Sequence, residues 1–216
     1  MPLFSPRSTP SRPQLLALAG LVLAALLVSA WRPFDRITWW LEVAPVLVAL
    51  PLLAATQGRY PLTSLLYALI ALHALVLILG GAYSYARVPL GFWMQQAWEL
   101  SRNPYDKIGH FMQGLVPAMV AREVLRRAGY GLGPRMLGFL VLSVVLAISA
   151  SYELIEWAAA VALGQGADEF LGTQGDPWDT QSDMGFAGLG AICALALLSR
   201  WHERQLGLPP AAAHRA

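Results

Sequence analysis

Residues 62–83 read LTSLLYALIALHALVLILGGAY and contain no Asp, Glu, Lys or Arg. A helix of about 20 predominantly apolar residues crosses the hydrocarbon core of a bilayer, which is roughly 30 Å thick. The stretch is apolar all round, so a helix built from it has no polar face to turn toward water. It therefore predicts a helix whose solvent is lipid.

Comparable stretches lie on both sides of this one. We expect transmembrane helices at residues 14–31, 37–56, 62–83, 107–126, 136–163 and 183–200. The composition agrees, because 56% of the residues are hydrophobic, 13% are charged and the mean hydropathy is +0.51, which excludes an ordinary soluble domain. The fold class predicted is all-α, a polytopic transmembrane bundle of about six helices, with the lipid bilayer as its first partner.

The basic residues indicate how the bundle is oriented. The connection at residues 126–135 is basic and rich in glycine, whereas residues 164–183 hold five acidic residues and no Lys or Arg. Cytoplasmic loops carry the excess of Lys and Arg. With both termini in the cytoplasm, ten of the 15 basic residues lie inside, so we expect this orientation in a bacterial inner membrane. The basic residues form no cluster, which argues against a nucleic-acid partner.

The first apolar segment has a second interpretation. Arg12 precedes the run, and Val28, Ser29 and Ala30 end it in a tolerable signal-peptidase pattern. The run is long for a signal peptide, so an uncleaved anchor is favoured and cleavage stays the alternative. We expect one membrane domain over residues 1–216: three less specific helices in 1–100, a motif-bearing three-helix core in 101–200, and a cytoplasmic tail in 201–216.

Ionisable side chains inside these helices occur in pairs at helical spacing. The pairs are Asp106 and His110, Glu153 and Glu156, and Asp179 and Asp183. Residues three or four apart share one face of a helix. A charge near the centre of a membrane helix costs roughly 2.5–3.5 kcal/mol on insertion scales, so each pair needs a partner, a cavity or a function. Several carboxylates in a dry place need protons or a cation to neutralise them.

These pairs predict a polar site near the outer end of the bundle. The candidate metal ligands are His110, Glu153, Glu156, Asp176, Asp179 and Asp183, and the candidate catalytic groups are His110, Glu153 and Glu156. Carboxylates suit hard divalent ions, while an imidazole favours zinc or iron. No H-E-x-x-H or E-x-x-H spacing occurs, so the residues do not identify the metal.

Structural interpretations compete with this one. In these interpretations Asp106 caps its helix, and His110 forms a buried hydrogen bond to a carboxylate instead of binding a metal. Glu42 and His73 stand alone in their segments, and we interpret both as structural. Arg122 is interpreted as a topology anchor whose long side chain reaches toward the interface.

Three blocks of the chain resemble a known family. They are NPYDKIGHFMQGLVPAMVAREVL at 103–125, SASYELIEWAAA at 149–160 and FLGTQGDPWDTQSDM at 170–184. Residues from about 101 to 200 closely resemble the YjdF-like family of bacterial inner-membrane proteins, which is functionally uncharacterised. A more distant resemblance is to the VanZ-like family, through Asp106, Lys107 and His110, then Glu153 or Glu156, then Asp183. That likeness implies polar residues that meet at one membrane face.

Two classes of function follow from the sequence. The first is a metal-dependent, membrane-embedded enzyme acting on an envelope or lipid-linked substrate. The alternative is a non-enzymatic protein, either a proton- or cation-linked transporter or a structural partner in an envelope complex. Few polar residues occur in the inner halves of the last three helices, which argues against a continuous path across the membrane. A third interpretation, that the polar residues only join helices by hydrogen bonds, stays open.

Overall fold

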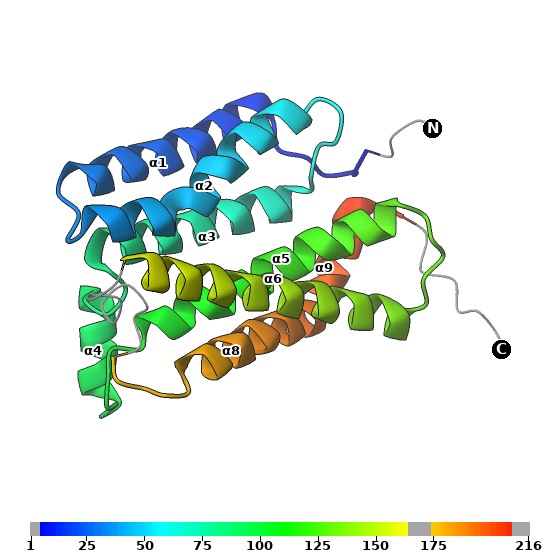
Figure 1. Ribbon diagram of the computed structural model, residues 1–216. Helices are drawn as coiled ribbons and strands as arrows, with labels where there is room; N and C mark the ends of the chain where they lie inside the picture. The colour runs from blue at the N-terminus through cyan, green and yellow to red at the C-terminus, as the bar shows by residue number, and fades with distance from the viewer. Residues whose placement is uncertain (1–4, 164–173, 209–216) are drawn as a thin grey trace.

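The computed structural model describes residues 5–163 and 174–208, and it confirms the all-α class (Figure 1). Its helices are α1 (Arg12–Trp31), α2 (Arg36–Thr56), α3 (Ser64–Tyr83), α4 (Pro89–Ala97), α5 (Tyr105–Arg127), α6 (Pro134–Leu163), α8 (Asp179–Cys193), the π-helical turn η1 (Ala194–Leu198) and α9 (Ser199–Leu206). The last three follow one another without a break. The six predicted crossings correspond to α1, α2, α3, α5, α6 and the α8–α9 run.

Five of these helical segments are long and apolar enough to cross a membrane: α1, α2, α3, α6 and the α8–α9 run. The exception is α5, which is as long as the others but carries ionisable side chains that bury against its neighbours. It packs against α3, α6 and α8. His110 and Arg122 on α5 are only 6% and 5% exposed, so the other helices shelter a segment too polar to face lipid alone.

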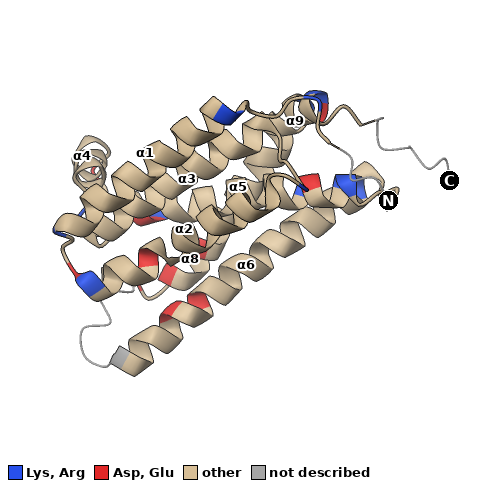
Figure 2. Ribbon diagram, turned by 90° about the horizontal axis from the view of Figure 1, so that it is seen from above, with Lys and Arg blue, Asp and Glu red and all other residues tan. Residues whose placement is uncertain are grey.

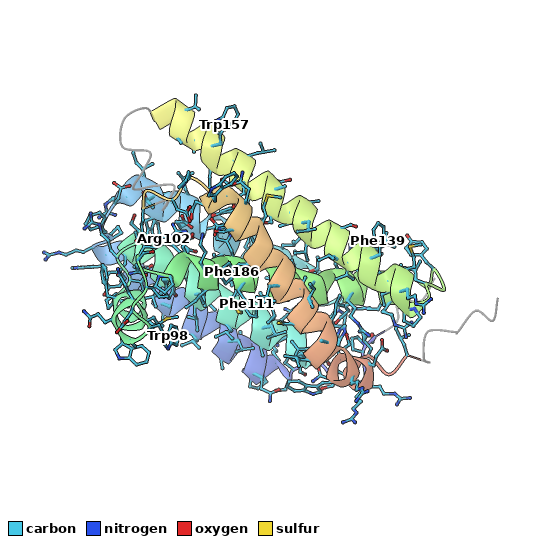
Figure 3. The ribbon with its side chains drawn as sticks, turned by 90° about the horizontal axis from the view of Figure 1, so that it is seen from below. Trp98, Arg102, Phe111, Phe139, Trp157 and Phe186 are labelled. Atoms are coloured by element: carbon cyan, nitrogen blue, oxygen red, sulfur yellow. The ribbon has the colours of Figure 1, made fainter. Side chains whose placement is uncertain are left out.

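The closest helix pair is α5 and α8, and glycines allow the approach. A Cβ at Gly114 of α5 would overlap the carbonyl oxygen of Ala187, and one at Gly190 of α8 would overlap that of Phe111. Small residues let membrane helices approach until their backbones touch. Figure 3 shows α8 crossing α5 with Phe111 and Phe186 near the crossing. This contact fixes the start of α8 beside the start of α5.

Local sequence explains where α2 and α3 begin. Asp35 precedes α2, and its Oδ1 accepts a hydrogen bond of 2.7 Å from the backbone N–H of Thr38. That bond stabilises the carboxylate and lowers the pKa of Asp35. Thr63 caps α3 in the same way. Within α2, Pro45 and Pro51 each remove a backbone hydrogen bond, so this helix is locally weakened.

The two ends of the bundle differ in charge. Both described ends of the chain lie at one end, where the backbone N–H of Arg7 donates to the carbonyl of Gln205 at 2.8 Å. We call it the basic end, and the opposite one, with the starts of α5 and α8 and the last turns of α6, the acidic end. Figure 2 shows most acidic positions in the half of the bundle away from the termini. Residues 201–206, expected in a tail, lie in α9, with His202 and Leu206 buried.

At the acidic end, α4 runs across the direction of the other helices (Figure 1). Trp93 and Trp98 are 63% and 60% exposed there, and Trp98 points away from the bundle (Figure 3). Exposed tryptophans at the end of a membrane bundle are typical of the interface between lipid and water. The helix thus suits a place along the membrane surface. Residues 164–173, part of the loop predicted to be acidic, lie outside the described residues.

Candidate functional site

The start of α5 is held by the residues just before it. The backbone N–H of Tyr105 donates to Asn103 Oδ1 at 3.0 Å, and Asn103 Nδ2 donates to the carbonyl of Val88 at 3.0 Å. The Gln174 side chain bonds the backbone of Asn103 on both sides, accepting from its N–H at 3.2 Å and donating to its carbonyl at 3.0 Å. These bonds fix the α5 entrance to the segment that leads into α8.

Three buried side chains meet at this end. Asp106 and His110 lie one turn apart on α5, and Asp183 comes from the first turns of α8. One potential ligand atom from each lies within 4.8 Å of the others. His110 Nε2 is 3.4 Å from Asp106 Oδ1 and 3.7 Å from Asp183 Oδ2. Two predicted pairs therefore converge, with Asp106 joining the expected ligands.

The two nitrogens of His110 face different partners. Nδ1 lies 3.2 Å from Gln113 Oε1 and 3.8 Å from Glu153 Oε1, on the side away from the two aspartates. An amide oxygen only accepts, so Nδ1 carries a proton in this arrangement. Nε2 is then the nitrogen directed at Asp106 and Asp183. A ring held by its other nitrogen in this way is the usual arrangement of a metal-binding histidine.

Two cations, rather than His110, face the predicted ligands Asp176 and Asp179. Arg102 Nη2 lies 2.9 Å from Asp176 Oδ2 and 2.6 Å from Asp179 Oδ1. Lys107 Nζ lies 2.7 Å from Asp179 Oδ1 and 2.6 Å from Asp183 Oδ1. The six expected ligands thus divide: Asp176 and Asp179 belong to an ion-pair network, and Asp183 takes part in both groups through different oxygens.

A cavity of about 170 Å³ lies beside the three residues. Asp106 and His110 form part of its wall, α6 contributes Tyr152 and Glu156, and α2 and α3 contribute Glu42 and His73. Glu156 therefore faces the cavity, whereas Glu153 is buried next to His110. Glu42 and His73, interpreted from sequence as structural, border the same space.

Tyrosine hydroxyls complete part of this wall. The Tyr152 hydroxyl donates to Glu42 Oε2 at 3.3 Å, which links α6 to α2. Tyr85, in the connection between α3 and α4, also lines the cavity. Burial, with the nearby Glu42 carboxylate as a smaller cause, raises the pKa of Tyr85 well above its usual range. Tyr85 therefore keeps its proton and acts as a hydrogen-bond donor.

Several polar atoms around the cavity have no hydrogen-bond partner. They are Asp106 Oδ2, Glu153 Oε1 and His73 Nε2, all of them buried. A buried polar atom without a partner typically costs about 1–3 kcal/mol, more for a charged group. Asp106 Oδ2 has Lys107 Nζ at 3.7 Å, too far for a hydrogen bond. The site therefore has coordinating capacity that the described side chains do not use.

A second buried polar network lies at the basic end. Glu123 Oε2 accepts from Thr63 Oγ1 and from His202 Nε2, both at 2.9 Å, and Glu123 Oε1 accepts from Arg127 at 2.9 Å. His202 Nδ1 in turn accepts from Arg122 at 2.7 Å. This network joins α3, α5 and α9. Arg122, interpreted as a topology anchor, is one of its internal members.

Sequence reasoning missed Lys107 and Arg102 as partners, and Glu42 and His73 as cavity residues. A signal for the first two existed, because Arg102 and Lys107 flank Asp106 in a chain segment that must sit near other acids. Nothing comparable marked Glu42 or His73. Neither has an ionisable residue three or four positions away on its helix, and only the packing of α3 against α5 and of α2 against α3 brings them to the site.

Comparison with known proteins places the chain in a family. The family described as "Predicted membrane protein (DUF2238)" matches residues 14–204. The chain belongs to this family. It is also 58% identical over 196 residues to the inner membrane protein YjdF of Escherichia coli (strain K12), an alignment that covers 90% of this chain and 94% of that one.

The family match confirms a multi-pass membrane protein of the YjdF-like type and extends the resemblance well beyond residues 101–200. These comparisons do not support the more distant likeness to VanZ-like proteins. No solved structure matches the chain. The function must therefore be argued from the site.

Proposed function

We propose that this protein is a metal-dependent, membrane-embedded enzyme whose divalent ion is held by Asp106, His110 and Asp183. The observation that carries the proposal is the approach of one ligand atom from each residue to within 4.8 Å, in a buried place. Two carboxylates and one imidazole form a mixed ligand set that suits zinc, manganese or iron. Three protein ligands leave a position open, as catalytic metal sites require.

The surrounding atoms support the same proposal. Asp106 Oδ2 lacks a hydrogen-bond partner, and Glu153 Oε1 beside His110 lacks one too. Gln113 Oε1 orients His110 by accepting from Nδ1, and the Glu153 carboxylate, 3.8 Å from the same nitrogen, favours a proton there. A bound divalent ion supplies a Lewis acid and lowers the pKa of a coordinated water.

Glu156 is the acid or base in this proposal. It lines the cavity on the α6 wall, while Asp106 and His110 line it on α5, so a substrate group in the cavity meets both. The membrane-embedded position favours a substrate from the envelope or from the lipid phase.

The non-enzymatic alternative has one observation in its favour. Arg102 and Lys107 already neutralise part of the charge on Asp176, Asp179 and Asp183. Proton binding at the remaining carboxylates would then balance the site without a metal. A through-path for ions has less support, because tightly packed apolar residues such as Leu66, Met119 and Val145 separate the two polar regions in the described part of the bundle.

Metal analysis of the detergent-purified full chain by plasma mass spectrometry tests the proposal. We expect near-stoichiometric divalent metal in the wild type and its loss in His110→Gln, because that change removes the imidazole ligand. The matched control is His73→Gln, which alters a cavity histidine outside the three ligands and should keep the metal. Wild-type protein that stays metal-free after exposure to zinc, manganese and iron rules the metal site out.

A second experiment tests for catalysis. Metal-loaded and chelator-treated protein are each incubated with a bacterial envelope lipid extract, and the lipids are compared by mass spectrometry. A species converted only by the metal-loaded sample supports the enzyme, and we expect Glu156→Gln to abolish that conversion while keeping the metal. Metal-loaded protein that converts no species argues for the non-enzymatic alternative.

A further inference from the structure

The helices that form the walls of the cavity do not all pack against one another. α6 packs against α5 and α8, and α2 packs against α3, but within the described residues no extensive packing joins α2 to α6. Both helices nevertheless line the same cavity, α2 through Glu42 and Pro45 and α6 through Ile148 and Tyr152. The hydrogen bond from Tyr152 to Glu42 is the described polar link between these two walls.

This side of the cavity faces the lipid. Ile148 lines the cavity and has 40% of its surface exposed, and it lies in the middle of the membrane-spanning α6. Pro45, on the opposite wall, interrupts the hydrogen bonding of α2 at the same place. A weakened helix beside a thinly packed gap can shift more easily than a regular, tightly packed one.

The size of the cavity limits what enters. Pockets that enclose drug-sized ligands measure about 300–1,000 Å³, and this one measures about 170 Å³. A polar head group fits inside, but acyl chains do not. An amphiphile entering from the membrane would therefore leave its chains in the bilayer.

The charges on the wall select the head group. Among the described lining residues the ionisable groups are carboxylates, imidazoles and tyrosine hydroxyls, with no Lys or Arg. Glu42 and Glu156 lie outside the three proposed metal ligands and can bind a cation as carboxylates, in which form Glu156 would serve the proposed enzyme as a base and not as an acid. A primary ammonium donates up to three hydrogen bonds and matches such a pair, whereas a purely anionic head group meets like charges.

We infer that the gap between α2 and α6 is a lateral entrance through which an amine-bearing membrane phospholipid places its head group in the cavity, with its ammonium between Glu42 and Glu156. The Tyr152–Glu42 hydrogen bond closes this entrance. The inference rests on the proposed function only in treating that lipid as the substrate, with its phosphate directed toward the cation that Asp106, His110 and Asp183 would hold.

Native mass spectrometry of the purified full chain tests the head-group selection. The chain is offered equal amounts of phosphatidylethanolamine and phosphatidylglycerol with the same acyl chains. We expect the chain to retain one phosphatidylethanolamine with about tenfold preference over phosphatidylglycerol. Each charge-assisted hydrogen bond to the ammonium contributes roughly the free energy that corresponds to a tenfold change in affinity. Glu42→Gln with Glu156→Gln should remove the preference, whereas Glu99→Gln, at an exposed position outside the cavity, should keep it. Equal retention of both lipids by the wild type overturns the inference.

A pair of substitutions on α6 tests the route. Ile148→Trp adds bulk at the entrance and should reduce lipid retention about tenfold. Ile155→Trp makes the same change at a 59% exposed position outside the cavity lining and should not. Tyr152→Phe, a conservative change, should speed lipid exchange by removing the closing hydroxyl. If Ile148→Trp and Ile155→Trp retain lipid equally, the entrance lies elsewhere.

Metal content is measured on the same samples, which separates the two proposals. Metal without selective lipid retention overturns the lateral entrance and leaves the metal site standing. Selective retention without metal supports the entrance and overturns the metal-dependent enzyme.

Discussion

Charged side chains inside this bundle are stabilised by ion pairs with residues distant in the sequence rather than by contact with water. Lys107 is the clearest case, because its ammonium lies between Asp179 and Asp183 of a helix more than 70 positions further along the chain. An unpaired lysine at this depth would be costly, and unpaired aspartates equally so. The pairing lets the start of α5 and the start of α8 bury charge together.

The buried carboxylate of Glu123 allows a sharp prediction about stability. It is 0% exposed and bonds Thr63, His202 and Arg127, so Glu123→Gln leaves the Arg127 guanidinium without its carboxylate. The new side-chain amide has only one oxygen to accept hydrogen bonds. When that oxygen accepts from Arg127, the amide nitrogen, a donor, faces His202 Nε2–H, which needs an acceptor. Removing one member of a buried ion pair costs about 3–5 kcal/mol.

We expect a clear fall in the thermal unfolding temperature of Glu123→Gln in detergent. Glu99→Gln makes the same chemical change at an exposed carboxylate and should change the unfolding temperature little. Equal unfolding temperatures for Glu123→Gln and wild type would show that the basic-end network contributes nothing to stability. Metal content should persist in any folded Glu123→Gln, because the network lies at the other end of the bundle.

At the scale of helices, the α5–α8 contact decides the geometry of the site. His110 and Asp183 meet only because Gly114 and Gly190 allow the two backbones to touch. A glycine costs roughly 1 kcal/mol relative to alanine in an ordinary helix interior, so alanine at most helical positions is stabilising. At these two positions the sign reverses, because the added methyl has no space.

Gly190→Ala tests this argument. Its Cβ meets the carbonyl of Phe111, so the helices must separate, at a cost of about 1–3 kcal/mol for overpacking. We expect a lower unfolding temperature and weaker retention of metal, since Asp183 moves away from His110. Gly185→Ala lies on the same helix with nothing near its Cβ and serves as the matched control. A Gly190→Ala protein as stable as Gly185→Ala would mean that the close crossing is not required.

For the whole molecule, the sequence predicted the helices far better than the partners. The stretch at 62–83 predicts α3 because apolar composition over a full bilayer thickness leaves one stable arrangement. His110 and Arg122 correctly indicated that α5 must be sheltered. The four-residue spacing also predicted that Asp106 lies on the same face of α5 as His110. These inferences succeed because they depend on local order alone.

What the sequence could not supply is the arrangement of helices around α5. Glu42 and His73 have no companion three or four positions away, so no local pattern separates a cavity wall from a structural contact. Asp179 looked equivalent to Asp183 on its helix, yet one faces Arg102 and Lys107 while the other also approaches His110. Those differences arise from how α8 is rotated against α5, which is a tertiary property.

The orientation of the bundle in the membrane is also a property of the complete fold. The two described ends of the chain lie together, which requires an even number of crossings, and basic side chains gather around them. The excess of basic residues predicts that this end is cytoplasmic and that the candidate site faces outward. Cysteine labelling can test this prediction, because Cys193 is the only cysteine in the sequence.

The test uses a Cys193→Ala background with one new cysteine at a time. Trp98→Cys, at the acidic end, should react with a membrane-impermeant maleimide in cells whose outer membrane has been opened. Tyr130→Cys, 71% exposed between α5 and α6, should react only after lysis. The reverse pattern would place the cavity near the cytoplasm. A substrate head group would then have to come from the inner leaflet, so this labelling also decides which leaflet should be labelled in later lipid-binding experiments.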